Sequence, residues 1–253
     1  MSFNDQYRPS GFGHLPVVTK NIVIINVIMY VLTIILKETQ HINLEDYLGL
    51  HYYLAPDFKP YQFITYIFMH QTYNELGQIT FAHIFFNMFG VFMFGRAIEE
   101  TWGPKRYLIF YIVTGLGAAL AQYIIMHFQI SPHLSELNAA IDSSTNTSDK
   151  AYLINQKYDY ISGLNRYVII GASGSLMGLL GAFGMLFPNQ MLYIYFLFPV
   201  KAKWLVIGYG AIELFLGISN NPGDNVAHFA HIGGLFVGII LVLLWRKDKS
   251  RFY

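Results

Sequence analysis

Residues 167–187 read YVIIGASGSLMGLLGAFGMLF, a run of 21 residues without a charged side chain. A helix that spans a bilayer needs about 20 mostly apolar residues, because each residue rises about 1.5 Å and the hydrocarbon core is about 30 Å thick. The run therefore predicts a membrane span. Five more such runs, bounded by polar or charged flanks, occur at 17–36, 79–98, 107–128, 204–218 and 228–245. Together they predict an all-α, polytopic membrane protein with six transmembrane helices.

The composition of the chain agrees with a membrane protein. Of its 253 residues, 54% are hydrophobic and only 12% are charged, whereas soluble domains carry about 25% charged residues. The formal net charge of +1 gives no electrostatic reason to expect a nucleic-acid partner. Because the chain has no cysteine, disulfides, cysteine metal sites and cysteine nucleophiles are excluded. Any nucleophile must be Ser, Thr, Lys or a carboxylate.

The distribution of cations predicts the orientation. Eleven of the 16 Lys and Arg residues lie at the two ends and in the second-to-third and fourth-to-fifth connections. By the positive-inside rule, both termini are predicted to be cytoplasmic. A bacterial plasma membrane is the expected location, because the chain is compact and shows neither extra domains nor a targeting sequence. The chain is interpreted as one membrane domain over 1–253. It has a short cytoplasmic segment 1–16, a mobile polar external loop 129–166 and a basic tail 246–253.

Polar side chains inside membrane spans are costly, so each one requires a reason. Even-numbered spans enter from the external side, and His83, Ser173 and His231 each follow the last polar flank by five to seven residues. At about 1.5 Å per residue, all three are predicted to lie roughly 8 to 10 Å deep. Asn87 shares a helical face with His83, one turn deeper. A serine, a histidine and two donors at one depth are typical of an acyl-transfer site, and no carboxylate is predicted in this layer.

Small residues line the spans that carry the serine and one of the histidines. Gly174, Gly178 and Gly181 recur in the fourth span, and Gly234 and Gly238 in the sixth. Such stripes let two helix backbones approach closely in a membrane. A short serine side chain could then reach an imidazole on the neighbouring helix.

Three motifs on these spans carry a resemblance to a known family. They read HIFFN at 83–87, GASG at 171–174 and AHIGGLFVG at 230–238, with GRAIE at 95–99 as a fourth point of agreement. In this order and on these spans, the sequence resembles the rhomboid family of intramembrane serine proteases over nearly the whole chain.

The resemblance implies a Ser-His dyad that works without an acidic residue. Ser173 would be the nucleophile and His231 the general base and acid, while His83 and Asn87 would stabilise the oxyanion. The expected activity is endopeptidase cleavage of transmembrane segments of other membrane proteins near the external face. The expected partners are these substrates and membrane lipid, and neither a cofactor nor a metal is expected.

Each polar residue also has an alternative interpretation. Ser173 could serve helix packing, and His83 and Asn87 could bond between helices. His228 and His231 could ligate a metal, although no cysteine or carboxylate partner is evident nearby. His228 is otherwise interpreted as a structural or rim residue. Glu213 could be a proton or gating group, but a neutral, hydrogen-bonded acid is favoured.

Two other classes of function remain open at this point. The first is a catalytically silent rhomboid-like protein that binds membrane helices, which predicts a missing Ser or His. The second is a small transporter, which predicts inverted repeats and broken helices. Neither feature occurs in the sequence. Residues 71–78 are interpreted as an insertion relative to the family pattern, without an assigned role.

Overall fold

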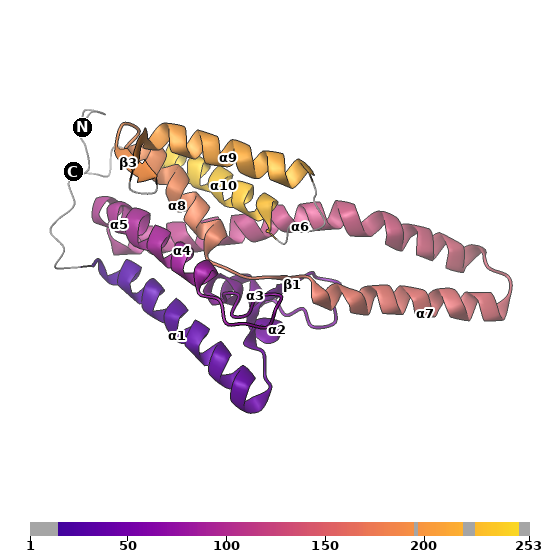
Figure 1. Ribbon diagram of the computed structural model, residues 1–253. Helices are drawn as coiled ribbons and strands as arrows, with labels where there is room; N and C mark the ends of the chain where they lie inside the picture. The colour runs from indigo at the N-terminus through magenta and orange to yellow at the C-terminus, as the bar shows by residue number, and fades with distance from the viewer. Residues whose placement is uncertain (1–14, 195–196, 220–225, 248–253) are drawn as a thin grey trace.

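The computed structural model describes residues 15–194, 197–219 and 226–247, so most of the predicted N-terminal segment 1–16 and of the basic tail 246–253 lies outside the described residues. The helices are α1 (Val17–Gln40), α2 (Leu44–Leu48), α3 (Gln62–Thr65), α4 (Ala82–Gly90), α5 (Arg96–Trp102), α6 (Pro104–Ser143), α7 (Thr147–Gly163), α8 (Ser173–Leu186), α9 (Ala202–Ser219) and α10 (His228–Lys247) (Figure 1). Short helical turns are η1 (Tyr66–Phe68), η2 (Val91–Gly95) and η3 (Leu164–Arg166). Two antiparallel pairs of strands join β1 (Leu50–His51) to β2 (Val168–Ile169) and β3 (Met191–Ile194) to β4 (Phe198–Lys201).

The architecture is that of an all-α, multi-pass membrane protein. In the described chain, α1, α6, α9 and α10 are long and apolar enough to cross a bilayer, and α8 is a shorter apolar helix. The second predicted span is divided into α4, the π-helical turn η2 and α5, which follow one another without a break. Four of the six predicted spans are therefore long single helices, and the other two correspond to α8 and to this divided run.

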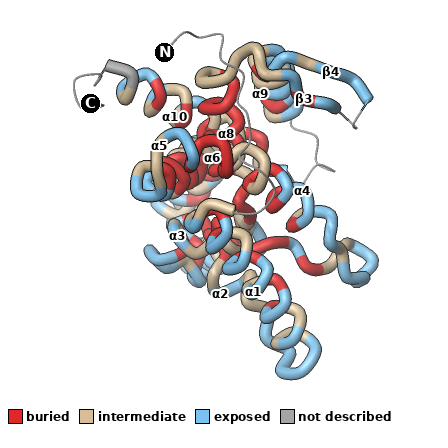
Figure 2. The backbone as a smooth tube through the Cα atoms, turned by 90° about the vertical axis from the view of Figure 1, so that its left-hand side faces the viewer, coloured by how far each residue is buried: buried red, intermediate tan, exposed pale blue. Residues whose placement is uncertain are grey.

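Helix α8 lies at the centre of the bundle, packed against α6, α9 and α10. Ten of its 14 residues are buried, and Figure 2 shows buried backbone concentrated around α6 and α8. Glycine makes this packing possible, because side chains on facing helices would overlap. A Cβ atom on Gly234 of α10 would overlap the carbonyl oxygen of Gly174, and one on Gly238 would lie 2.7 Å from that of Gly178.

Helix α8 begins later than the sequence predicted. Its first residue is Ser173, not Tyr167, because Val168 and Ile169 form β2 and pair with β1. Gly171 has a φ of +120°, a conformation outside the helical region that glycine adopts readily. The count of helical rise from Arg166 to Ser173 therefore does not hold, since the intervening residues are not helical.

The predicted mobile external loop 129–166 is instead a helical hairpin. Helix α6 continues to Ser143 despite Pro132 in its interior, and α7 runs back beside it (Figure 1). Asn146 caps α7 by accepting a hydrogen bond from the Ser148 N–H at 2.9 Å, as expected for an Asn at this position. The hairpin base is fixed by a small apolar cluster: Tyr52, Ala55, Met126, Ile130 and Leu164. The polar composition of 142–150 marks the tip of the hairpin, not an irregular loop.

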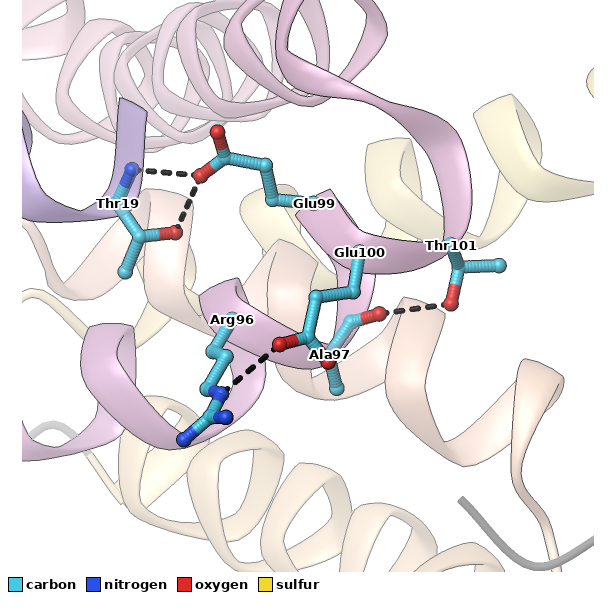
Figure 3. A network of polar contacts seen from close by, with 6 residues as sticks. All are labelled: Thr19, Arg96, Ala97, Glu99, Glu100 and Thr101. Carbon is cyan, nitrogen blue, oxygen red and sulfur yellow. Dashed lines mark hydrogen bonds and ion pairs between the residues drawn. The ribbon is translucent and has the colours of Figure 1, made fainter. Parts of the chain in front are cut away.

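A buried carboxylate joins the start of α1 to α5 (Figure 3). Glu99 is only 4% exposed and accepts hydrogen bonds from the Val18 N–H at 2.9 Å, the Thr19 N–H at 2.7 Å and the Thr19 Oγ at 2.8 Å. The first N–H groups of a helix have no partner within the helix, and a negative charge there also interacts favourably with the helix dipole. Glu99 therefore acts as an N-terminal cap supplied from a distant part of the chain.

Replacing Glu99 with Ala is expected to lower the free energy of unfolding by about 3 kcal/mol, because buried donors left without an acceptor cost about 1 to 3 kcal/mol each. Thermal unfolding of the detergent-solubilised protein measures the effect. Glu136→Ala is the control, since the Glu136 side chain is 80% exposed and its loss is expected to change stability little. Equal melting temperatures for the two variants would contradict the capping role.

Candidate active site

Ser173 is the first residue of the central helix α8. The segment before Ser173 is not helical, and Gly171 within it has a positive φ. Because the helix starts at Ser173, its side chain and its backbone N–H both lie at the helix N-terminus. The N–H groups of this first turn have no carbonyl partner within the helix. Ser173 thus combines a hydroxyl with backbone donors that favour negative charge.

His231 reaches this hydroxyl from α10. It is the fourth residue of α10, and its Nε2 lies 2.8 Å from Ser173 Oγ. The close packing of Gly174 against Gly234 brings the two backbones near enough for this contact. The structure thus brings together the two residues that the sequence predicted as nucleophile and base.

His83 of α4 lies beside the N-terminus of α8. Its Nδ1 accepts a hydrogen bond from the Gln71 N–H at 3.2 Å, so a neutral His83 ring carries its proton on Nε2. That Nε2 lies 3.0 Å from the point where a Cβ on Gly171 would be, and Ser173 Oγ lies 3.6 Å from the same point. His83 therefore presents an N–H donor beside the N-terminus of α8.

Asn87 lies one turn after His83 on α4, the placement that their spacing predicts. Its Nδ2 donates to the carbonyl oxygen of His83 at 2.9 Å, within its own helix. The side chain is buried, and its Oδ1 has no hydrogen-bond partner among the described residues. The amide still has one N–H to offer, but the hydrogen bonds of the described chain do not join it to Ser173.

The prediction that no carboxylate lies in this layer is wrong. Glu213 of α9 is 4% exposed, and its Oε2 lies 3.0 Å from His231 Nδ1 and 2.7 Å from His228 Nδ1. The sequence singled out Glu213 but did not place it. Counting inward from the end of α9 at Ser219 gives six residues, within the five to seven that placed Ser173, His83 and His231. The signal was present, but it was applied only to the even-numbered spans.

Glu213, His228 and His231 also form a set of potential metal ligands, since one ligand atom from each lies within 4.8 Å of the others. The sequence-based argument against a metal, that no carboxylate is nearby, therefore does not hold. The contacts have the spacing of hydrogen bonds or ion pairs, however. Two ligands on a tetrahedral zinc ion are separated by about 3.3 Å, whereas Glu213 Oε2 is 2.7 Å and 3.0 Å from the two imidazoles.

His70 packs beside the site in the connection between α1 and α4. Its ring is 1% exposed and stands edge to face with the His83 ring, with 5.0 Å between centroids. Burial, with a smaller contribution from His83, lowers the pKa of His70 to about 3. The folded protein therefore holds this imidazole neutral, whereas the unfolded chain protonates it near its ordinary pKa of about 6.5.

Stability is consequently expected to fall as the pH is lowered from 6.5 toward 3, because the unfolded state binds a proton that the folded state excludes. The melting temperature measured across this range should decline less steeply for His70→Phe, which keeps a buried ring but cannot titrate. His133→Phe serves as the comparison, because the His133 side chain is half exposed. An unchanged pH slope in His70→Phe would refute this assignment.

Comparison with known proteins agrees with this geometry. A family model described as "Rhomboid domain" matches residues 57–248. Among curated proteins, the chain is 28% identical to RHOMBOID-like protein 12, mitochondrial, of Arabidopsis thaliana over 71% of this chain and 47% of that protein. It is 25% identical to Rhomboid-like protein 11, chloroplastic, of the same plant, over 83% and 64% of the two chains.

A bacterial relative is also similar. The chain is 24% identical to Rhomboid protease AarA of Providencia stuartii, over 65% of this chain and 51% of that protein. The chain thus spans between about half and two thirds of the length of these relatives. The family match covers most of the chain, including α4, α8 and α10 with the Ser173–His231 contact, and the chain belongs to the rhomboid family.

Proposed function

We propose that this protein is an intramembrane serine endopeptidase that cleaves transmembrane segments of other membrane proteins. The observation that supports this most directly is the 2.8 Å contact between Ser173 Oγ and His231 Nε2 at the N-terminus of a buried helix in a rhomboid chain. We assign Ser173 as nucleophile, His231 as general base and acid, and His83 and Asn87 as oxyanion donors.

The proposed reaction starts with transfer of the Ser173 hydroxyl proton to His231 Nε2, as Oγ attacks the carbonyl carbon of the scissile bond. The oxyanion is held by the Ser173 N–H, the His83 Nε2–H and the remaining N–H of the Asn87 amide. His231 then gives its proton to the leaving amine, and an acyl-enzyme remains on Ser173. A water molecule loses a proton to His231 and attacks the acyl carbon, which releases the carboxylic acid and restores the serine hydroxyl.

The orientation belongs to the same proposal. Ser173, His231 and His83 lie near the N-terminal ends of α8, α10 and α4, which the cation distribution assigns to the external side. Both termini would then be cytoplasmic, and cleavage would occur near the external face of a plasma membrane, within one membrane domain. The kind of membrane is also part of this proposal, since the relatives include proteins named as mitochondrial and chloroplastic.

Labelling with a fluorophosphonate probe tests the proposal. The probe is expected to modify the folded, detergent-solubilised protein and to fail with Ser173→Ala. Ser175→Ala is the matched control on the same helix, since Ser175 Oγ donates to the Tyr111 carbonyl at 2.8 Å and takes no part in the reaction. A folded wild-type protein that stayed unlabelled, and that left single-span substrates in vesicles uncut, would favour a silent helix-binding protein instead.

The oxyanion assignment makes a separate prediction. His83→Ala is expected to lower kcat for cleavage of a membrane substrate by roughly 100-fold to 1,000-fold, the usual effect of removing one oxyanion donor, with a smaller change in KM. Phe86→Ala, a truncation of a 66% exposed side chain on the same helix, should leave kcat near the wild-type value. Equal rates for His83→Ala and wild type would remove His83 from the mechanism.

A further inference from the structure

We propose that Glu213 is a positioning residue that completes a Ser173–His231–Glu213 triad, with His228 holding the carboxylate in place. This inference deepens the proposed function and rests on it. It departs from the two-residue arrangement that the sequence predicted.

The three groups form a continuous chain of contacts through the two ring nitrogens of His231. Nε2 lies 2.8 Å from Ser173 Oγ, and Nδ1 lies 3.0 Å from Glu213 Oε2. A neutral imidazole carries its proton on one nitrogen only. A carboxylate beside Nδ1 favours the proton there and leaves the Nε2 lone pair directed at the serine hydroxyl, which is the tautomer that a general base requires.

The same carboxylate is fixed from a second direction. His228, three residues before His231 on α10, has its Nδ1 2.7 Å from Glu213 Oε2, and the two imidazole rings are nearly perpendicular, at 88°. The His228 contact restricts the rotation of the Glu213 side chain and keeps its Oε2 beside His231 Nδ1.

Burial gives the carboxylate an energetic role during the reaction. Glu213 and Ala202 are the buried residues of α9, and an acid is costly within a membrane span unless it is paired. When His231 takes the serine proton it becomes an imidazolium, which is equally costly there. Glu213 turns that cation into half of an ion pair. The gain is realised only after proton transfer, so it lowers the barrier without tightening substrate binding.

The test compares wild type with Glu213→Gln, Glu213→Asp and Ile212→Ala, using the rate of fluorophosphonate labelling and the kcat and KM of substrate cleavage. Glu213→Gln is expected to lower the labelling rate and kcat by roughly 100-fold to 10,000-fold, with KM nearly unchanged. Glu213→Asp keeps the charge and should recover a large part of the loss. Ile212→Ala changes a 55% exposed neighbour on the same helix and should match wild type.

The split between kcat and KM, together with rescue by the conservative variant, separates positioning from mere support of the fold. A residue that only supports packing would lower the amount of active protein in both variants alike. A positioning carboxylate is instead partly replaced by the Asp side chain and lost with Gln.

These experiments distinguish failure of the triad from failure of the proposed protease activity. If wild type is labelled and Glu213→Gln reacts at the wild-type rate, the triad is wrong and the proposed protease stands. If Glu213→Asp is as inactive as Glu213→Gln while both fold, as judged by circular dichroism and thermal unfolding, the charge is not the relevant property and the inference fails. Loss of wild-type labelling on treatment with EDTA would instead identify the cluster as a metal site and overturn the triad. A folded but unlabelled wild type would overturn both proposals.

Discussion

Replacing His231 with Asn is expected to reduce the rate of serine labelling and of substrate cleavage by roughly 10,000-fold to 1,000,000-fold, the largest effect of any single substitution apart from removal of the nucleophile. An amide in this position can accept a hydrogen bond from Ser173 but cannot carry the proton from the serine to the leaving amine. The serine would then have to attack as a neutral hydroxyl. Single-turnover labelling, followed over hours, measures rates this low.

The control for this experiment is His133→Asn. His133 lies in the α6–α7 hairpin, and its side chain is half exposed, with Glu136 3.9 Å away. Its replacement should leave the labelling rate at the wild-type level. A His231→Asn variant that labels within tenfold of wild type would show that another group takes the proton, and the proposed mechanism would have to be abandoned.

The second large effect is expected from Gly234→Val, which changes no reacting group. A Cβ atom at residue 234 overlaps the backbone of Gly174, so α10 can accept a branched side chain only by moving away from α8. A displacement of about 1 Å at a reacting contact costs on the order of 100-fold in rate, and overpacking a close-packed interior costs about 1 to 3 kcal/mol or more. Both activity and melting temperature should fall.

The matched control is Gly208→Val on α9, where a Cβ meets no other atom within 4 Å. This variant should retain wild-type stability and labelling. If Gly234→Val behaved in the same way, the 2.8 Å contact between Ser173 and His231 would not depend on the close approach of the two helices. The small-residue stripe would then lose its assigned role.

The apolar spans were predictable from the sequence because the bilayer imposes one length scale on every helix that crosses it. The ends of the elements were less predictable. Whether residues 167–172 continue α8 or leave it depends on β2 finding a partner at Leu50 and His51, more than a hundred positions earlier. Hydropathy does not distinguish an apolar strand of this kind from an apolar helical turn.

The candidate site was likewise predictable from the sequence only in part. Ser173, His231 and His83 stand out because polar residues are rare in apolar helices and because their motifs are short and local. The role of Glu213 depends on how α9 turns its faces toward α10, which a single apolar helix with most residues exposed does not reveal. The helical hairpin α6–α7 was missed because a polar helix lacks the long apolar signature that identified the spans.

The short length of α8 affects how water reaches Ser173. Its 14 residues rise about 21 Å, so the helix falls about 9 Å short of a hydrocarbon layer about 30 Å thick. An isolated helix with this hydrophobic mismatch would thin the lipid around it, but α8 is enclosed by α6, α9 and α10, where acyl chains do not reach. We expect the missing depth to lie on the Ser173 side, because the segment before Ser173 is not helical and Ser173 itself is only partly buried. A hydrolytic water molecule would then reach the serine through a shallow well, without a long channel.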